Sequence, residues 1–208
     1  MKKYLIILRK KHFYVFLGSV ILFIVIALFI NNNGIANLDN LGTKVALFLR
    51  EYAFLYSIFV IITTLGSAYF LIPLSILLLL IFKHHKMSIY ISLNLLCSWL
   101  LNIFLKSIFM RKRPDIMLID EIGFSFPSGH ATVSLAFYGF IIYLIYLKMK
   151  SKWKYLYISS LSLLIILIGV SRLYFGVHYL SDILGGYLLS LAYLVIFISI
   201  YNLSMRKQ

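Results

Sequence analysis

A histidine and an aspartate stand four residues apart, at His178 and Asp182, in the stretch SRLYFGVHYLSD between two long apolar runs. If the second run begins as a helix near Tyr179, both side chains project from one face. The carboxylate can then accept the N–H of one imidazole nitrogen and leave a lone pair on the other. That arrangement prepares a histidine to act as a base or a nucleophile. Arg172, in the same stretch, supplies a rigid fork of donors suited to a phosphate or a carboxylate.

A second chemical segment is Pro127-Ser128-Gly129-His130, which begins another apolar run. Serine is a good N-cap, and glycine permits close approach of a ligand to the backbone. The first N–H groups of a helix are unpaired and form an anion site with the positive end of the helix dipole. His130, in the first turn, could stand beside a bound anion and give it a proton.

A third segment, KSIFMRKRP, runs from Lys106 to Pro114 and follows a polar stripe at every fourth position, namely Asn94, Ser98, Asn102 and Lys106. The first three residues of the stripe favour hydrogen bonding between helices. Lys106 is more informative, because an ionisable residue this close to a membrane span is costly and usually functional. Arg113 lies in the same outward-facing segment. Two roles fit Arg111 and Lys112: they could attract an anionic headgroup, or their side chains could snorkel to the membrane surface. Asp115, Asp120 and Glu121 are interpreted as solvated loop charges.

The elements that must position these residues are membrane helices. The chain of 208 residues is 62% apolar and 12% charged, with a mean hydropathy of +0.98. A soluble domain of this size could not bury so much apolar surface, so the bilayer is the implied solvent. We predict an all-α polytopic protein with a single domain over residues 1–208. Its six spans are expected near residues 13–30, 65–82, 87–109, 128–147, 155–173 and 179–201.

Two further elements follow from the pattern. Leu38, Leu41, Val45, Phe48 and Tyr52 share one helical face, which predicts an amphipathic helix on the outer membrane surface. The apolar run 53–82 is too long for one straight crossing, so we expect a break between Thr63 and Ser67 and a kink at Pro73.

The net charge of +14 is distributed as in a multi-spanning protein rather than as in a nucleic-acid-binding one. Thirteen of the twenty basic residues lie in the acid-free segments 1–12, 83–86, 148–154 and 205–208, and all six acids lie in the alternate segments. By the positive-inside rule both termini are cytoplasmic, and the acid-containing loops are outside. The three chemical segments then share the outer side of a cell membrane.

The order Lys106-x6-Arg113-Pro114, then Pro127-Ser128-Gly129-His130, then Ser171-Arg172-x5-His178-x3-Asp182 resembles the type 2 phosphatidic acid phosphatase family. Each motif alone is moderate evidence, and the three together are strong. The soluble vanadium haloperoxidases share the family's anion pocket, but six spans argue against them.

The resemblance implies that His178 attacks phosphorus and forms a phosphohistidine, that Asp182 holds its tautomer, and that His130 is the general acid and base. Lys106, Arg113 and Arg172, with Ser128 and the Gly129 N–H, would bind the phosphate oxygens. It also implies a reaction without a metal or other cofactor, and the chain shows no metal-ligand spacing. The expected substrates are undecaprenyl diphosphate and phosphatidylglycerophosphate, with phosphatidic acid or another lipid phosphate as the alternative.

Two other classes remain. The polar stripe would suit a transporter, but a transport path needs polar groups that continue to the cytoplasmic side. A catalytically silent scaffold would not need intact signature residues. The oligomeric state does not follow from the sequence.

Overall fold

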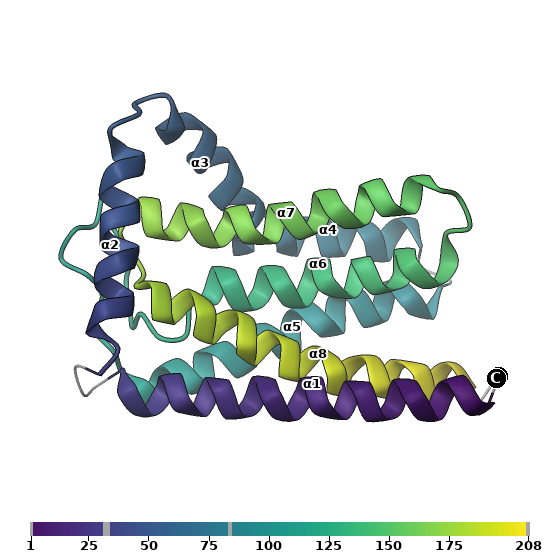
Figure 1. Ribbon diagram of the computed structural model, residues 1–208. Helices are drawn as coiled ribbons and strands as arrows, with labels where there is room; N and C mark the ends of the chain where they lie inside the picture. Colours follow the sequence, from purple (N-terminus) through teal and green to yellow (C-terminus); the bar gives the residue numbers. More distant parts are fainter. Residues whose placement is uncertain (1, 31–33, 83–84, 207–208) are drawn as a thin grey trace.

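The computed structural model describes residues 2–30, 34–82 and 85–206, and within them every regular element is an α-helix. In chain order the helices are α1 (Lys2–Phe29), α2 (Ala36–Arg50), α3 (Leu55–Leu65), α4 (Ala68–Ile81), α5 (Lys86–Phe109), α6 (Gly129–Lys148), α7 (Trp153–Tyr174) and α8 (Leu180–Arg206). All but α2 and the tilted α3 run roughly along one direction in Figure 1.

Five of these helices, α1, α5, α6, α7 and α8, are long and apolar enough to cross a membrane, and α3 and α4 together form a sixth, bent candidate. The predicted all-α membrane bundle is therefore confirmed. The second crossing differs from the predicted span 65–82, because residues 55–65 are also helical. A bend of 45° separates α3 from α4, at Gly66 and Ser67, and Pro73 lies within α4.

Close packing explains the position of this bend. A Cβ on Gly66 would lie 2.6 Å from Cγ2 of Ile168 on α7, and real Cβ atoms do not approach other atoms so closely. Glycine is therefore required where the chain passes α7, and it also weakens the helix there. The predicted break between Thr63 and Ser67 is confirmed.

Helix α2 lies across one end of the bundle (Figure 1). The side chains of Leu41, Val45 and Phe48 point away from the protein and are 53%, 39% and 55% exposed. The opposite face buries Asp39, Gly42 and Ala46. The predicted amphipathic helix is thus present, and its protein-facing side is formed by small residues and one acid.

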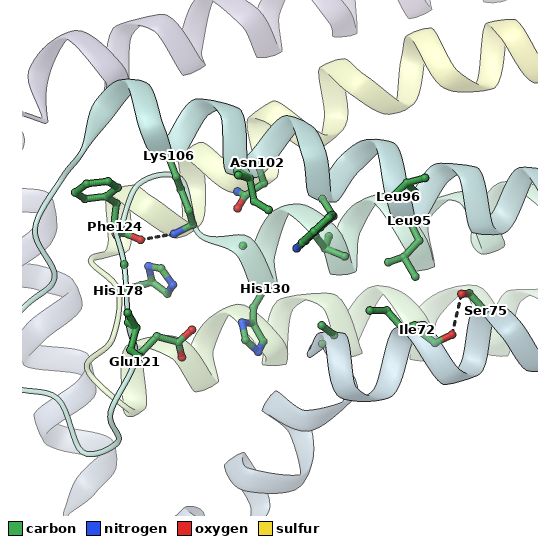
Figure 2. A pocket seen from close by; sticks show the side chains of 18 of the residues that line it. Ile72, Ser75, Leu95, Leu96, Asn102, Lys106, Glu121, Phe124, His130 and His178 are labelled. Carbon is green, nitrogen blue, oxygen red and sulfur yellow. Dashed lines mark hydrogen bonds between the residues drawn. The ribbon is translucent and has the colours of Figure 1, made fainter.

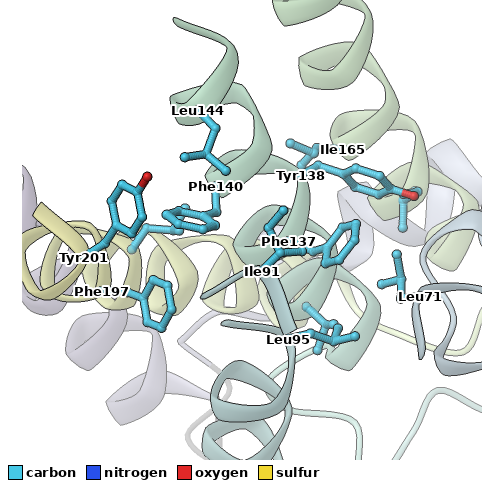
Figure 3. Packing of buried hydrophobic residues seen from close by; sticks show 13 residues of the cluster. Leu71, Ile91, Leu95, Phe137, Tyr138, Phe140, Leu144, Ile165, Phe197 and Tyr201 are labelled. Carbon is cyan, nitrogen blue, oxygen red and sulfur yellow. The ribbon is translucent and has the colours of Figure 1, made fainter. Parts of the chain in front are cut away.

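The core centres on α6, whose aromatic side chains meet α8 and α5 (Figure 3). Phe140 of α6 packs edge-on against Phe197 and Tyr201 of α8, with ring centroids 5.2 and 5.3 Å apart. In lipid such contacts stabilise the bundle through dispersion and shape complementarity rather than through exclusion of water. This packing holds the first turns of α6 and α8 at the same end of the molecule.

The two ends of the bundle carry different segments. The start of α1, the C-terminal end of α8 and the α6–α7 connection lie at one end, and α2 and the α5–α6 and α7–α8 connections lie at the other (Figure 1). The three chemical segments therefore share one end, as the sequence predicts. The ends of three basic segments (residues 1, 83–84 and 207–208) lie outside the described residues.

Candidate active site

His178 lies in the short turn between α7 and α8, one turn before Asp182 in the first turn of α8. The two side chains are 3% and 0% exposed as residues. Nδ1 of His178 is 3.4 Å from Oδ2 of Asp182, and the same oxygen accepts the backbone N–H of Tyr179 at 2.9 Å. The helix start and the pairing predicted from the spacing of four are both present.

The other imidazole nitrogen faces a cation. Nε2 of His178 is 3.3 Å from Nη1 of Arg113. Because a guanidinium can only donate, this contact assigns the lone pair to Nε2 and the proton to Nδ1. Burial, followed by the charges of Lys106, Arg172 and Arg113, lowers the pKa of His178 well below 6.5. The imidazole is therefore neutral at pH 7.

A backbone hydrogen bond and close packing hold the start of α6 against the start of α8. Ser128 is the N-cap of α6, and its hydroxyl accepts the Ala131 N–H at 3.5 Å, which confirms the predicted cap. The Ser128 N–H donates to the backbone oxygen of Asp182 at 3.0 Å. A Cβ on Gly186 would lie 2.9 Å from the Ser128 oxygen, so glycine permits this close contact. The first turns of the two helices are thereby fixed relative to each other.

The three cations converge on one segment of the α5–α6 connection, residues 121–124. The Lys106 ammonium donates to the Phe124 oxygen. Arg113 donates through Nε to the Gly123 oxygen at 3.0 Å and through Nη2 to the Ile122 oxygen at 3.2 Å. These oxygens occupy donors that would otherwise be available to an anion.

Arg172 contacts the same segment through Glu121. Nη2 of Arg172 pairs with the Glu121 carboxylate, and Nη1 donates to Oγ1 of Thr63 at 2.8 Å. The other Glu121 oxygen is 3.8 Å from Nη2 of Arg113. The interpretation of Glu121 as a solvated loop charge is therefore wrong, because the carboxylate lies between two buried arginines.

A cavity of about 470 Å³ opens beside these groups (Figure 2). Five of the eight predicted site residues line it: Lys106, Arg113, Gly129, His130 and His178. Ser128, Arg172 and Asp182 lie behind its wall, each 2% exposed or less. Figure 2 shows His130 and His178 on opposite sides of the space beneath Lys106. The predicted residues are thus gathered in two layers, with the groups able to meet a ligand in front.

Two residues that sequence reasoning did not assign stand behind Asp182. Arg111 donates through Nη1 to Oδ1 of Asp182 at 2.6 Å and through Nη2 to Oδ2 of Asp39 at 2.5 Å. Its side chain is 10% exposed, so neither headgroup attraction nor snorkelling describes it. Asp39 is 72 positions away along the chain, and no local pattern connects the two. Lys112 is exposed, which is compatible with both headgroup attraction and snorkelling.

Among the described residues, no three His, Cys, Asp or Glu side chains are grouped as metal ligands would be. The charged groups in and around the cavity are instead cations with a few buried carboxylates. Such a site can hold an oxyanion against fixed donors and present a neutral imidazole to it.

The comparisons with known proteins agree with this chemistry. The family model of the PAP2 superfamily matches residues 87–206. Phosphatidylglycerophosphatase B of Bacillus subtilis is 33% identical over 175 residues, which cover 81% of this chain and 86% of that protein. An undecaprenyl-diphosphatase of Sulfolobus acidocaldarius is 26% identical over 194 residues, which cover 88% and 87% of the two chains.

Two solved structures are also similar. The crystal structure of a transmembrane PAP2-type phosphatidylglycerolphosphate phosphatase from Bacillus subtilis superposes with a TM-score of 0.82 at 30% identity, over 91% of this chain and 96% of that one. The structure of Aquifex aeolicus LpxE gives a TM-score of 0.57 at 28% identity, over 71% and 87%. With the family model covering more than half of its length, this chain belongs to the PAP2 superfamily and is a membrane lipid phosphate phosphatase.

Proposed function

We propose that this protein hydrolyses a lipid phosphate or diphosphate through a phosphohistidine on His178, without a metal ion, at the extracytoplasmic face. The observation that carries the proposal is the placement of His178. One ring nitrogen faces a buried carboxylate at 3.4 Å, and the other faces Arg113 at 3.3 Å on the wall of a cation-rich cavity. A nucleophile activated in this way is aimed at the place where an anion would bind.

In the first step, the substrate phosphoryl group displaces the oxygens of residues 122–124 from Lys106 and Arg113. Departure of the Glu121 carboxylate then opens Arg172, behind the cavity wall, to the phosphate. The Gly129 N–H, at the N-terminus of α6, adds a further donor. The Nε2 lone pair attacks phosphorus, and the bond to the leaving oxygen breaks. His130 gives a proton to that oxygen, while Asp182 stabilises the charge that develops on His178.

In the second step, water attacks the phosphohistidine. His130, now without its proton, accepts one from the water, the N–P bond breaks, and inorganic phosphate leaves. Each step requires one proton transfer at the same place, so a single residue on the cavity wall is sufficient for both. Replacing a general acid of this kind typically costs about 10²–10⁴-fold in rate.

The lipid tail has a path beside this site. From the phosphate end, the cavity continues between α4 and α5, along Ile72, Ser75, Leu95 and Leu96 (Figure 2). Its α5 wall runs from Lys106 back to Ser92, fourteen residues or about 21 Å of helix. One leaflet is half of the bilayer's hydrocarbon core of about 30 Å, so this wall is long enough to lie along an acyl chain or the first part of a prenyl chain.

Within this substrate class we propose phosphatidylglycerophosphate and undecaprenyl diphosphate. The named activities of the two curated relatives support both choices. The cavity wall along α4 and α5 is mostly apolar, so it would contact the hydrocarbon chain of a lipid rather than its headgroup. Phosphatidic acid is the alternative substrate of the same site.

The direct test is release of phosphate from these three lipids by purified protein in the presence of EDTA. We expect activity on at least one lipid, undiminished by the chelator. His178→Gln should abolish it, whereas His85→Ala, an exposed histidine at the opposite end, should not. A base-stable, acid-labile phosphoenzyme should appear in the wild type under rapid quench. Substantial activity of the His178 variant, or complete loss in EDTA, would contradict the proposal.

The orientation is tested separately. Asp120 is exposed in the α5–α6 connection, and the basic segment 148–154 joins α6 to α7 at the other end of the bundle. A cysteine introduced at position 120, in a background without Cys97, should react with an impermeant reagent in intact cells. Labelling only after permeabilisation would place the site on the cytoplasmic face.

A further inference from the structure

Arg111 contacts the proposed catalytic pair from outside the cavity. Its guanidinium donates to Asp182 and to Asp39 with different nitrogens, and the Nη1 that meets Asp182 also donates to the Ser181 hydroxyl at 2.7 Å. The guanidinium carbon lies 4.1 Å from the ring centre of Tyr179. Arg111 does not line the cavity, and its contact with the proposed catalytic pair is with Asp182.

The two carboxylate oxygens of Asp182 contact different partners. Oδ2 receives the Tyr179 N–H and faces His178, and Oδ1 receives Arg111. Hydrogen bonds on both oxygens define the plane of the carboxylate. Because the side chain of Asp182 is fully buried, its Oδ1 depends on Arg111 as a donor rather than on bulk water.

Asp39 completes this arrangement from α2. Its Oδ2 accepts Arg111, and its Oδ1 accepts the backbone N–H of Ser181 at 3.0 Å. That N–H belongs to the first turn of α8 and has no partner within its own helix. A Cβ on Gly42 would lie 2.7 Å from the Leu180 Cβ, so α2 is seated directly on this turn.

The charges of Asp39, Arg111 and Asp182 also determine the electrostatic field at His178. Arg111 alone would neutralise Asp182 and weaken the attraction that an imidazolium on His178 needs. With Asp39 present, two carboxylates and one guanidinium leave one net negative charge beside His178. Arg111 can therefore orient Asp182 without cancelling its effect.

We propose that Arg111 and Asp39 are positioning residues for the reaction, so that α2, an element outside the three motifs, sets the geometry of the His178–Asp182 pair. The inference rests on the proposed role of His178 as nucleophile. Loss of this support displaces or reorients Asp182, and a misplacement of about 1 Å in a catalytic group can cost about 10²-fold in rate.

The experiment compares Arg111→Ala, Asp182→Ala and the double variant for kcat, KM and inhibition by inorganic phosphate. We expect Arg111→Ala to lower kcat by about 10²-fold, with KM and the phosphate inhibition constant changed less than about 3-fold. The double variant should lose no more than Asp182→Ala, because residues that act as one unit are not additive. Additive losses, or an unchanged kcat, would overturn the proposal.

Arg50→Ala is the matched control. Arg50 also reaches from α2 to the end of α7 and to the α5–α6 connection, where it donates to the Tyr174 and Ile116 oxygens at 2.8 Å each, but it contacts no proposed catalytic residue. A kcat loss equal to that of Arg111→Ala would show a general need for anchored loops and overturn the specific role. If Arg111→Ala does not fold, Asp39→Asn serves instead. It keeps the shape, and it should lower kcat by about 10-fold while leaving KM unchanged; a normal kcat would refute the role of Asp39.

His178→Gln separates this inference from the proposed function. A His178 variant that stays active removes the nucleophile and the positioning role with it. An inactive His178 variant together with a fully active Arg111→Ala removes only the positioning role.

Discussion

Glu121→Gln should make the enzyme bind its substrate more tightly. The Glu121 carboxylate pairs with Arg172 and lies 3.8 Å from Arg113, two of the cations proposed to hold the phosphate. A phosphoryl group can take these donors only after the carboxylate leaves them. Glutamine has nearly the same shape but carries no charge, so it competes less well for a guanidinium.

The size of the effect follows from the ion pair that must be broken. A hydrogen bond to a charged group contributes roughly 1.5–3 kcal/mol. The Glu121 side chain is 30% exposed, so solvent screening reduces this to about 1–2 kcal/mol. At about 1.4 kcal/mol per factor of ten, the inhibition constant for inorganic phosphate and the KM should both fall by about 5–30-fold.

The assay is steady-state hydrolysis of a short-chain lipid phosphate, with inorganic phosphate or vanadate as competitor. Asp120→Asn is the matched control, because Asp120 is the neighbouring carboxylate and is exposed. It should change both constants by less than about 2-fold at physiological ionic strength, where exposed charges are screened. An unchanged or weaker phosphate affinity in Glu121→Gln would refute the reasoning and make Glu121 a support for Arg172.

Two further predictions concern pH and packing. Because burial and nearby cations lower the pKa of His178 well below 6.5, the neutral nucleophile persists as pH falls through 6.5. The acid limb of kcat/KM should therefore lie below pH 6.5, and a limb at or above that value assigned to His178 would contradict the site's electrostatics. Gly42→Ala places a methyl group 2.7 Å from the Leu180 Cβ and should destabilise the protein by about 1–3 kcal/mol, measured by thermal unfolding in detergent. Gly18→Ala is the control, since a Cβ there meets nothing within 4 Å; equal losses in both variants would contradict the packing argument.

Much of the fold could be predicted because membrane helices have a strong local signal. Apolar runs of about 20 residues, separated by basic or acidic segments, locate the spans to within a few residues. The second crossing was harder, because residues 55–65 are apolar, helical and yet too short to cross alone. Whether α3 and α4 form one bent crossing depends on the packing of Gly66 against α7, and a local sequence pattern does not reveal that contact.

Some contacts in the candidate site could likewise be predicted from the sequence, and others could not. His178 and Asp182 could be paired from their spacing, since residues four apart meet on one helix face. Ser128 could be identified as a cap from its position before an apolar run. Glu121 and Arg111 could not be placed, because their partners lie 51 and 71 residues away in the chain.

The sequence by itself therefore determined the chemistry available to this protein: a membrane bundle with two histidines, an aspartate and three cations at one end. Those features depend on residue type and on helical periodicity, which act over a few residues. Only the tertiary structure decided which groups face the cavity, which carboxylate occupies the cations, and which helix supports Asp182. Those features depend on contacts between segments distant in the chain, where a buried charge must find a partner and the fold alone decides which one is within reach.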